Sequence, residues 1–178
     1  MSAGLSESAL VVLAPAAEPL VKHYRDQFDP AAALGVPAHL TVLYPFLPPG
    51  LPPAVMARLA ALFGELAPFD YSLAELRRFP GVLYLAPEPD APFRLLTRRL
   101  AEAFPEFPPY GGKFADVVPH LTLAQFADED RLETVAADFQ AACGPRLPLA
   151  LRAEGVALMD NDQGAWRVCA TFRLGPLE

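Results

Sequence analysis

The chain has 178 residues, of which 53% are hydrophobic and 20% are charged. This length allows one domain, or two lobes that share a core, and the composition excludes a disordered chain. The formal net charge of −7 argues against non-specific binding to duplex DNA, because such binding needs a basic face. No apolar run reaches membrane-spanning length and the first residues lack a positively charged leader region, so we expect a soluble, cytoplasmic protein.

Hydrophobic periodicity predicts alternating strands and helices over the first half of the chain. The helix at 52–66 has the clearest signal, with a regular apolar stripe and prolines in its first turn. The predicted elements, in chain order, are strand 9–14, helix 18–28, loop 29–37, strand 39–46, helix 52–66, strand 69–79 and strand 82–86.

The second half continues the mixture and ends in a pair of strands. Its predicted elements are helix 91–104, loop 105–114, strand 117–126, helix 128–143 and a closing hairpin of strands 147–159 and 166–174 around a turn at 160–164. Adjacent strand pairs favour an α+β protein with antiparallel sheets over a doubly wound parallel sheet. The arginines Arg94, Arg98 and Arg99 are expected on the solvent face of their helix. Cys143 and Cys169 are expected to be buried thiols outside any disulfide framework.

A short motif occurs twice in the chain. His39-Leu40-Thr41 recurs as His120-Leu121-Thr122, 81 residues later, and each copy lies in a predicted strand just behind a proline. Because side chains alternate faces along a strand, histidine and threonine point to one side while the apolar residues point to the core. One such tripeptide is ordinary sheet chemistry, but the two copies use two of the three histidines in the chain.

The segments HLTVLYPF (39–46) and PHLTLAQF (119–126) resemble the paired H-x-T motifs of the two-histidine (2H) phosphoesterases, which include 2′-5′ RNA ligase-like proteins and cyclic nucleotide phosphodiesterases. The resemblance covers residues 10–174. It implies one bilobal α+β domain over 1–178, in which two pseudo-symmetric lobes, each an antiparallel sheet with helices on its outer face, flank a central catalytic groove. It also implies that His39 and His120 are catalytic and that Thr41 and Thr122 bind phosphate.

The chemistry of the residues agrees with this resemblance. Cleavage of a phosphodiester needs a base that activates the nucleophile and an acid that protonates the leaving oxygen, and two imidazoles supply both. Neither histidine adjoins a metal-binding pattern, so neither a metal nor another cofactor is expected. The resemblance implies hydrolysis of 2′,3′-cyclic or 2′,5′-linked phosphodiesters of nucleotides or RNA ends, with ATP-independent 2′-5′ ligation as the reverse reaction. Which histidine is the base stays open.

Three further positions bear on the substrate. Tyr44 and Phe46 are candidates to stack on a base, although aromatic residues at a strand end also serve as core. Gln125 stands where many RNA ligase-like proteins have a basic residue, which weakens the prediction of ligation. Lys113 follows a glycine pair and is a candidate phosphate ligand, with a plain surface turn as the alternative.

The expected partner is therefore a small nucleotide or RNA end, bound by a monomer that uses neither duplex DNA nor a membrane. The alternative function is a non-catalytic nucleotide- or RNA-binding module on the same fold. Two intact H-x-T motifs argue against it, because binding alone needs no titratable imidazoles. The third histidine, His23, is expected on the surface of its helix.

Overall fold

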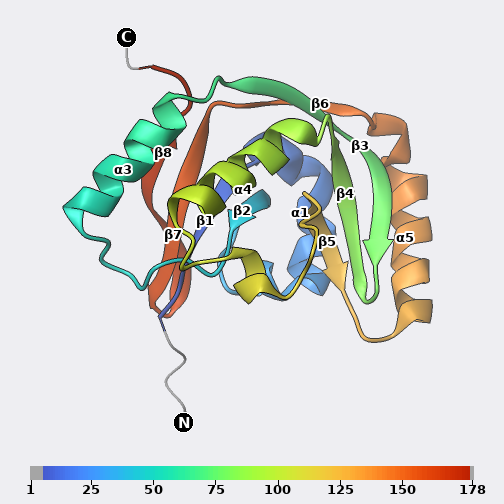
Figure 1. The fold of residues 1–178 in the computed structure, drawn as a ribbon. Helices are drawn as coiled ribbons and strands as arrows, with labels where there is room; N and C mark the ends of the chain where they lie inside the picture. The colour runs from blue at the N-terminus through green and yellow to red at the C-terminus, as the bar shows by residue number, and fades with distance from the viewer. Residues whose placement is uncertain (1–5, 177–178) are drawn as a thin grey trace.

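Two four-stranded antiparallel sheets form the framework of the protein (Figure 1). The computed structural model describes residues 6–176. The first sheet has the strand order β2-β1-β7-β8 and the second has the order β5-β4-β3-β6. The α+β class with antiparallel sheets, predicted from the order of elements, is confirmed. The strands are β1 (Ser8–Leu13), β2 (His39–Leu43), β3 (Phe69–Phe79), β4 (Val82–Glu88), β5 (Leu121–Gln125), β6 (Leu149–Ala153), β7 (Gly155–Gln163) and β8 (Ala165–Arg173).

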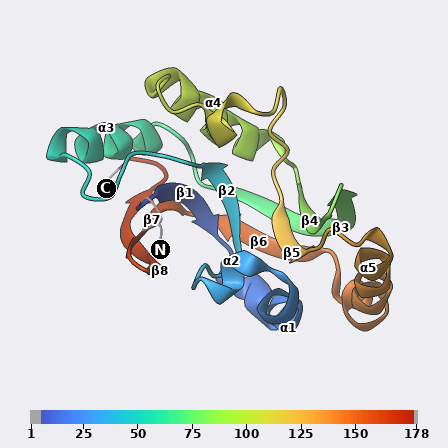
Figure 2. The same cartoon turned by 90° about the horizontal axis from the view of Figure 1, so that it is seen from below.

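Helices connect and cover the sheets, with α1 and α4 on opposite sides of β2 and β5 in Figure 2. The start of helix α5 has a clear local cause. The Asp128 side chain accepts hydrogen bonds from two backbone amides of the first turn, and two further acidic residues follow, which suit the positive end of the helix dipole. The helices are α1 (Glu18–Phe28), α2 (Pro30–Ala33), α3 (Pro53–Gly64), α4 (Ala91–Ala103) and α5 (Glu129–Cys143), with short 3-10 turns η1 (Pro15–Ala17), η2 (Pro109–Gly112) and η3 (Gly144–Arg146).

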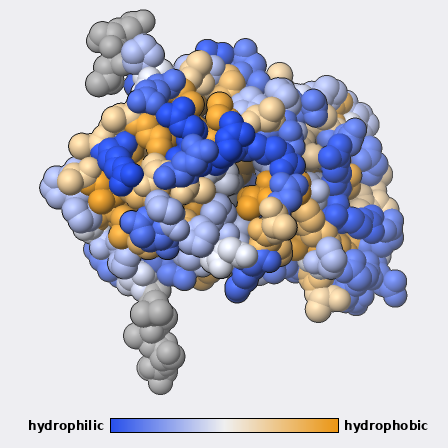
Figure 3. All heavy atoms as spheres, viewed as in Figure 1, coloured by the Kyte–Doolittle hydropathy of each residue, from blue (hydrophilic) through white to orange (hydrophobic). Residues whose placement is uncertain are grey.

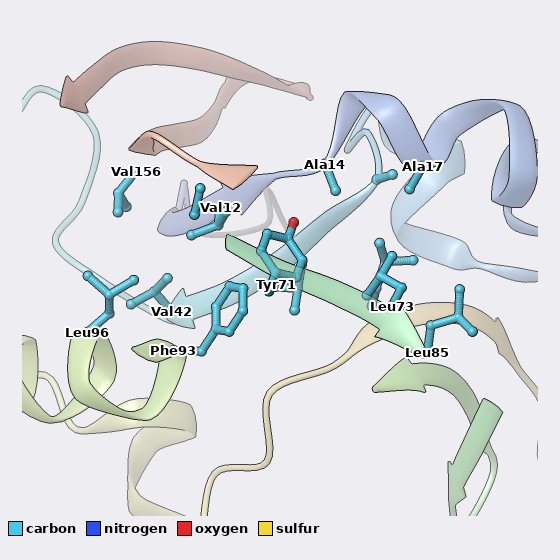
Figure 4. Close-up of a cluster of buried hydrophobic side chains, with 14 of the residues drawn as sticks. Val12, Ala14, Ala17, Val42, Tyr71, Leu73, Leu85, Phe93, Leu96 and Val156 are labelled. Atoms are coloured by element: carbon cyan, nitrogen blue, oxygen red, sulfur yellow. The ribbon is translucent and has the colours of Figure 1, made fainter. Parts of the chain in front are cut away.

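One hydrophobic core joins both sheets. It includes side chains of β1 and β2 from the first sheet, of β3, β4 and β5 from the second, and of α1, α3, α4 and α5. Figure 4 shows Val12 of the first sheet and Phe93 of α4 beside Tyr71 of the second sheet, in one buried cluster. Phe93 meets the Tyr71 ring edge-on at 4.9 Å between centroids. The two sheets are therefore held by shared burial rather than by a linker.

The two halves repeat one structural unit. In each, a strand leads through a helix to an antiparallel partner at the edge of the sheet: β1, α1 and β2 in the first sheet, and β4, α4 and β5 in the second. One H-x-T motif begins the edge strand β2, and the histidine of the other directly precedes the edge strand β5. This agrees with the pseudo-symmetry that the resemblance of the two motifs implied.

The C-terminal third departs from the prediction of one hairpin. The segment 147–159 is not one strand: β6 pairs with β3 in the second sheet, while β7 crosses to the first sheet and pairs with β1 and β8. Gly155 begins β7 so close to β8 that an added Cβ would lie 2.7 Å from the Phe172 carbonyl oxygen. Asp160 is not a turn residue but a buried member of β7. A local apolar pattern does not specify which sheet a strand joins.

Other local predictions also needed correction. Loop 29–37 contains the short helix α2, and the strand predicted from residue 117 begins only at Leu121. Cys143 is buried as expected, whereas Cys169 is exposed because it lies on the outer face of the edge strand β8. His23 is exposed, as predicted.

The surface in Figure 3 mixes polar side chains with small apolar patches. Within residues 6–176 no helix is both long enough and apolar enough to cross a membrane.

Candidate active site

The two H-x-T strands meet at the middle of the molecule. Strand β2 is an edge of the first sheet, β5 is an edge of the second, and the two strands are in contact. His39 and Thr41 are half-buried on β2, as are His120 and Thr122 at the corresponding positions, while the leucine of each motif is fully buried. The structure thus brings the four predicted motif residues to neighbouring strand edges.

Both strands bulge at the same point of the motif. On β2, Thr41 pairs with Val11 and Leu43 with Leu10, so Val42 is an extra residue. On β5, Leu123 is the extra residue directly after Thr122. A bulge bends its strand and redirects side chains, and bulges are frequent beside functional sites. The two halves therefore share the same β-bulge directly after the threonine, in addition to the H-x-T motif itself.

Each catalytic candidate is held by the backbone just before it. His39 Nδ1 lies 2.7 Å from the carbonyl oxygen of Pro37, and His120 Nδ1 lies 2.7 Å from that of Val118. Because a carbonyl oxygen can only accept, Nδ1 must carry the proton in both rings. In the neutral imidazole Nε2 is then a free acceptor, and in the protonated imidazole it is a donor.

Burial favours the neutral form of both imidazoles. It is the main cause that lowers the pKa of His39 from 6.5 to about 4, against the opposing effect of the Pro37 carbonyl, while Arg25 and His120 lower it further. Burial also lowers the pKa of His120, and the Val118 carbonyl opposes the change. The negative charge of Asp29 raises the pKa of both histidines, so this carboxylate lies within electrostatic reach of both.

Two aromatic rings pack against His120. Phe79 and Tyr84 meet its imidazole edge-on at centroid distances of 5.3 and 5.6 Å, and they stack on each other at 4.3 Å. These contacts keep water from one side of the ring, which agrees with the lowered pKa.

A cavity of about 240 Å³ opens beside His39 and Thr41. Trp166 and Tyr44 contribute aromatic walls, with ring centroids 6.2 Å apart. The Tyr44 hydroxyl donates to Glu7 Oε2 at 2.7 Å, and the Trp166 amide donates to the Leu34 carbonyl oxygen at 2.8 Å. The remaining lining is apolar and comes from β1, α2 and its loop, and β7: Ala9, Val11, Ala31, Leu34, Val36 and Met159.

The turn η2 brings Tyr110 to the same side of the site. The Tyr110 amide donates to the Tyr44 carbonyl oxygen at 2.6 Å, and the two rings lie 6.4 Å apart. Tyr110 has the left-handed backbone φ of 52°, which is unfavourable outside glycine, and two glycines with positive φ follow it. Lys113 lies exposed at the end of this turn. Tyr110 thus binds the chain directly after β2 through its backbone.

Several residues of the site were not identified from sequence. Trp166 and Tyr110 reach it only through long-range packing. The sequence offered one signal for Arg25, because this residue lies four positions after Val21, on the apolar stripe of α1. In the structure Arg25 is only 2% exposed. Arg94 is half-exposed, in line with its predicted place on the solvent side of the helix. Its guanidinium also donates to the Val117 carbonyl oxygen at 3.3 Å, a contact that the sequence did not indicate. Gln125 is exposed at the end of β5.

In the part of the chain that the structure describes, no three or more histidine, cysteine, aspartate or glutamate side chains are grouped so that they could hold a metal ion.

Comparisons with known proteins point to one family and one fold. A family model described as the 2′-5′ RNA ligase superfamily matches residues 12–165. A search of curated protein sequences gave no significant match. Among solved structures, TT0787 of Thermus thermophilus has 21% sequence identity and a TM-score of 0.59, over 97% of this chain and 100% of that chain.

Two further structures give the same result. E. coli LigT in complex with 3′-AMP has 18% identity and a TM-score of 0.57, over 96% of this chain and 99% of that chain. A protein described as a phosphoesterase has 18% identity and a TM-score of 0.58, over 96% and 98% of the two chains. At such identities the likeness concerns the fold, in which two sheets place two edge strands side by side.

Proposed function

Because the chain belongs to the 2′-5′ RNA ligase superfamily of 2H phosphoesterases, we propose that it hydrolyses 2′,3′-cyclic or 2′,5′-linked phosphodiesters of small nucleotides or RNA ends without a metal. One observation carries this proposal: His39 begins the edge strand β2, His120 directly precedes the neighbouring edge strand β5, and the proton on each Nδ1 leaves each Nε2 for proton transfer. Acid–base cleavage of a phosphodiester needs one such imidazole in its neutral form as the base and the other protonated on Nε2 as the acid.

The stronger depression of its pKa favours His39 as the general base, since a neutral imidazole accepts a proton. His39 Nε2 takes a proton from water as the water oxygen attacks phosphorus. The protonated His120 donates from Nε2 to the departing ribose oxygen, which leaves a free hydroxyl beside a phosphomonoester. The negative phosphate of the bound substrate raises the pKa of His120 and so favours its protonated form.

The two threonines support the reaction at the phosphate. Thr41 and Thr122 share the strand faces of the histidines and are half-buried. Their hydroxyls donate to the non-bridging oxygens, where negative charge develops in the transition state. Lys113, at the end of the η2 turn, is proposed to neutralise charge on the phosphate.

The cavity beside His39 accommodates the nucleobase. Its walls are Trp166, Tyr44 and aliphatic side chains, and stacking on aromatic rings accepts any base. E. coli LigT, which has the same fold, was solved with 3′-AMP, NADP+ and ATP, all of which are small nucleotides. The net charge of −7 also favours a small substrate over a long RNA strand.

Hydrolysis of 2′,3′-cyclic nucleotides in excess EDTA tests the proposal. We expect turnover by the wild type and by His23→Ala, which changes the exposed third histidine. His39→Ala and His120→Ala should each lose about 10²–10⁴-fold in kcat, the contribution typical of a general acid or base. Full activity in either variant overturns the two-histidine mechanism. A wild type that binds 3′-AMP but turns over no cyclic or 2′,5′-linked substrate is instead a nucleotide-binding module.

A further inference from the structure

Two arginines make the same contact in the two halves of the molecule. Arg25 of α1 donates from Nη2 to the carbonyl oxygen of Val36 at 3.0 Å, and Arg94 of α4 donates from Nη1 to that of Val117 at 3.3 Å. Each acceptor lies three residues before the catalytic histidine of its half. The next carbonyl along the chain is the one that binds Nδ1 of that histidine.

Carboxylates hold both guanidinium groups in place. Asp29 accepts from Arg25 Nε at 3.0 Å, and both side chains of this ion pair are 3% exposed. Arg94 donates to Asp90 at 2.7 Å and to Asp116 at 2.6 Å. A guanidinium fixed on one edge by carboxylates presents its remaining N–H groups in a defined direction. In each half one of these N–H groups donates to the carbonyl oxygen three residues before the histidine.

The contact does not simply follow from the repeated fold. Arg25 lies near the C-terminal end of α1 and its carboxylate follows it, whereas Arg94 lies near the N-terminal end of α4 and Asp90 precedes it. Different helix positions therefore reach equivalent carbonyls. In the first half a second hydrogen bond fixes the same stretch of backbone: the Ala38 amide, directly after Pro37, donates to Glu18 Oε1 at 2.6 Å.

We propose that Arg25 and Arg94 are positioning residues for the reaction proposed above. Each arginine binds one backbone carbonyl, and the next carbonyl along the chain accepts the hydrogen bond from the Nδ1 of the histidine. By fixing this stretch of backbone, the arginine sets the tautomer and the direction of one imidazole without touching the substrate. Partners that fix a histidine tautomer in this way determine which nitrogen is available for proton transfer. This inference rests on the proposed function for its catalytic meaning, but its structural content can be tested without turnover.

Arg94→Gln is the variant with the least risk to folding, because Arg94 is half-exposed. Arg98→Gln is the matched control, because Arg98 lies on the same helix, is 65% exposed and pairs with Glu102. For the buried pair, Arg25→Met combined with Asp29→Asn removes both charges together, so that no unpaired charge stays buried. The side-chain carbonyl that this double variant keeps at position 29 can still accept from the Ala31 amide, which Asp29 now binds.

The decisive measurement is the ¹⁵N NMR spectrum of the imidazoles at neutral pH in the free protein. In Arg94→Gln we expect His120 to become a mixture of the two neutral tautomers, while His39 keeps its proton on Nδ1; the double variant should do the reverse. The kcat for a 2′,3′-cyclic nucleotide should fall roughly tenfold with little change in KM, as expected for misplaced catalytic groups. Arg94→Lys should restore part of this loss, and Arg98→Gln should change neither quantity.

A folded Arg94→Gln protein in which His120 keeps its proton on Nδ1 overturns the inference, as does a tautomer change that leaves kcat unaltered. If the wild type hydrolyses no substrate, the proposed function fails by itself. The tautomer of His120 in Arg94→Gln then still decides whether Arg94 positions this ring.

Discussion

His39 and His120 stand in the same relation to their own backbones: each Nδ1 lies 2.7 Å from the carbonyl oxygen two residues earlier. The identical bond in two halves, beside two identical strand bulges, leaves both Nε2 atoms free on neighbouring strand edges. Their surroundings differ, however. Arg25 lies near His39, whereas Phe79 and Tyr84 surround His120. This difference predicts distinct roles in one reaction.

The pH dependence of catalysis follows from the two lowered pKa values. The base must be neutral, and the pKa of His39 is about 4, so activity should rise as pH increases through that value. The acid must be protonated, and the pKa of His120 lies below 6.5 in the free protein, so kcat/KM should fall as pH rises above it. We expect a bell-shaped profile of kcat/KM, with its maximum between the pKa of His39 and the pKa of His120. A profile that still rises at pH 8 would contradict the assignment of His120 as the acid.

Folding stability should depend on pH through the same histidine. The folded state lowers the pKa of His39 from 6.5 to about 4, so the unfolded chain binds this proton more readily. The resulting stabilisation is complete above pH 6.5 and is lost as pH falls toward 4. Urea unfolding of the wild type should therefore show a midpoint that decreases over this range.

His39→Gln should remove part of that decrease, because glutamine does not titrate. The control is His23→Gln, which changes an exposed histidine and should keep the wild-type slope. Equal slopes in the wild type and in His39→Gln would show that His39 does not contribute to the pH dependence of stability.

Trp166 should contribute to substrate binding rather than to chemistry. It forms a wall of the cavity beside His39 and Thr41. Trp166→Ala should raise KM for a 2′,3′-cyclic nucleotide about tenfold, since base–aromatic stacking contributes about 1–3 kcal/mol. We expect kcat to change little. Val168→Ala is the control, because Val168 lies exposed on the same strand and does not line the cavity; an unchanged KM in Trp166→Ala would place the base elsewhere.

Gly155 should be sensitive to the smallest substitution. A Cβ at this position would lie 2.7 Å from the Phe172 carbonyl oxygen, which belongs to the paired strand β8 and cannot easily move. Gly155→Ala should therefore lower the free energy of unfolding by about 1–3 kcal/mol, as overpacking does. At the end of helix α3, Gly64→Ala meets its nearest atom at 3.8 Å and should be neutral or slightly stabilising. Chemical denaturation of both variants measures the difference, and equal stabilities would contradict the close approach of β8.

Most of the local structure and the candidate catalytic residues could be predicted from the amino-acid sequence alone. Apolar periodicity predicted the strands and helices because burial imposes one period on a strand and another on a helix. The repeated H-x-T tripeptide indicated the catalytic candidates His39 and His120, since alternation along a strand places histidine and threonine on one face. These signals lie within a few consecutive residues, and a single chain therefore displays them.

Features that depend on segments far apart in the chain became evident only from the packing of the whole molecule. It divided 147–159 between two sheets, because an apolar pattern is satisfied by pairing with either. It showed that Arg94, expected on the surface, also donates to the Val117 carbonyl oxygen. It also brought Trp166 and Tyr110 to the cavity and to β2. Such contacts join residues far apart in the chain, and no local period encodes which partners meet.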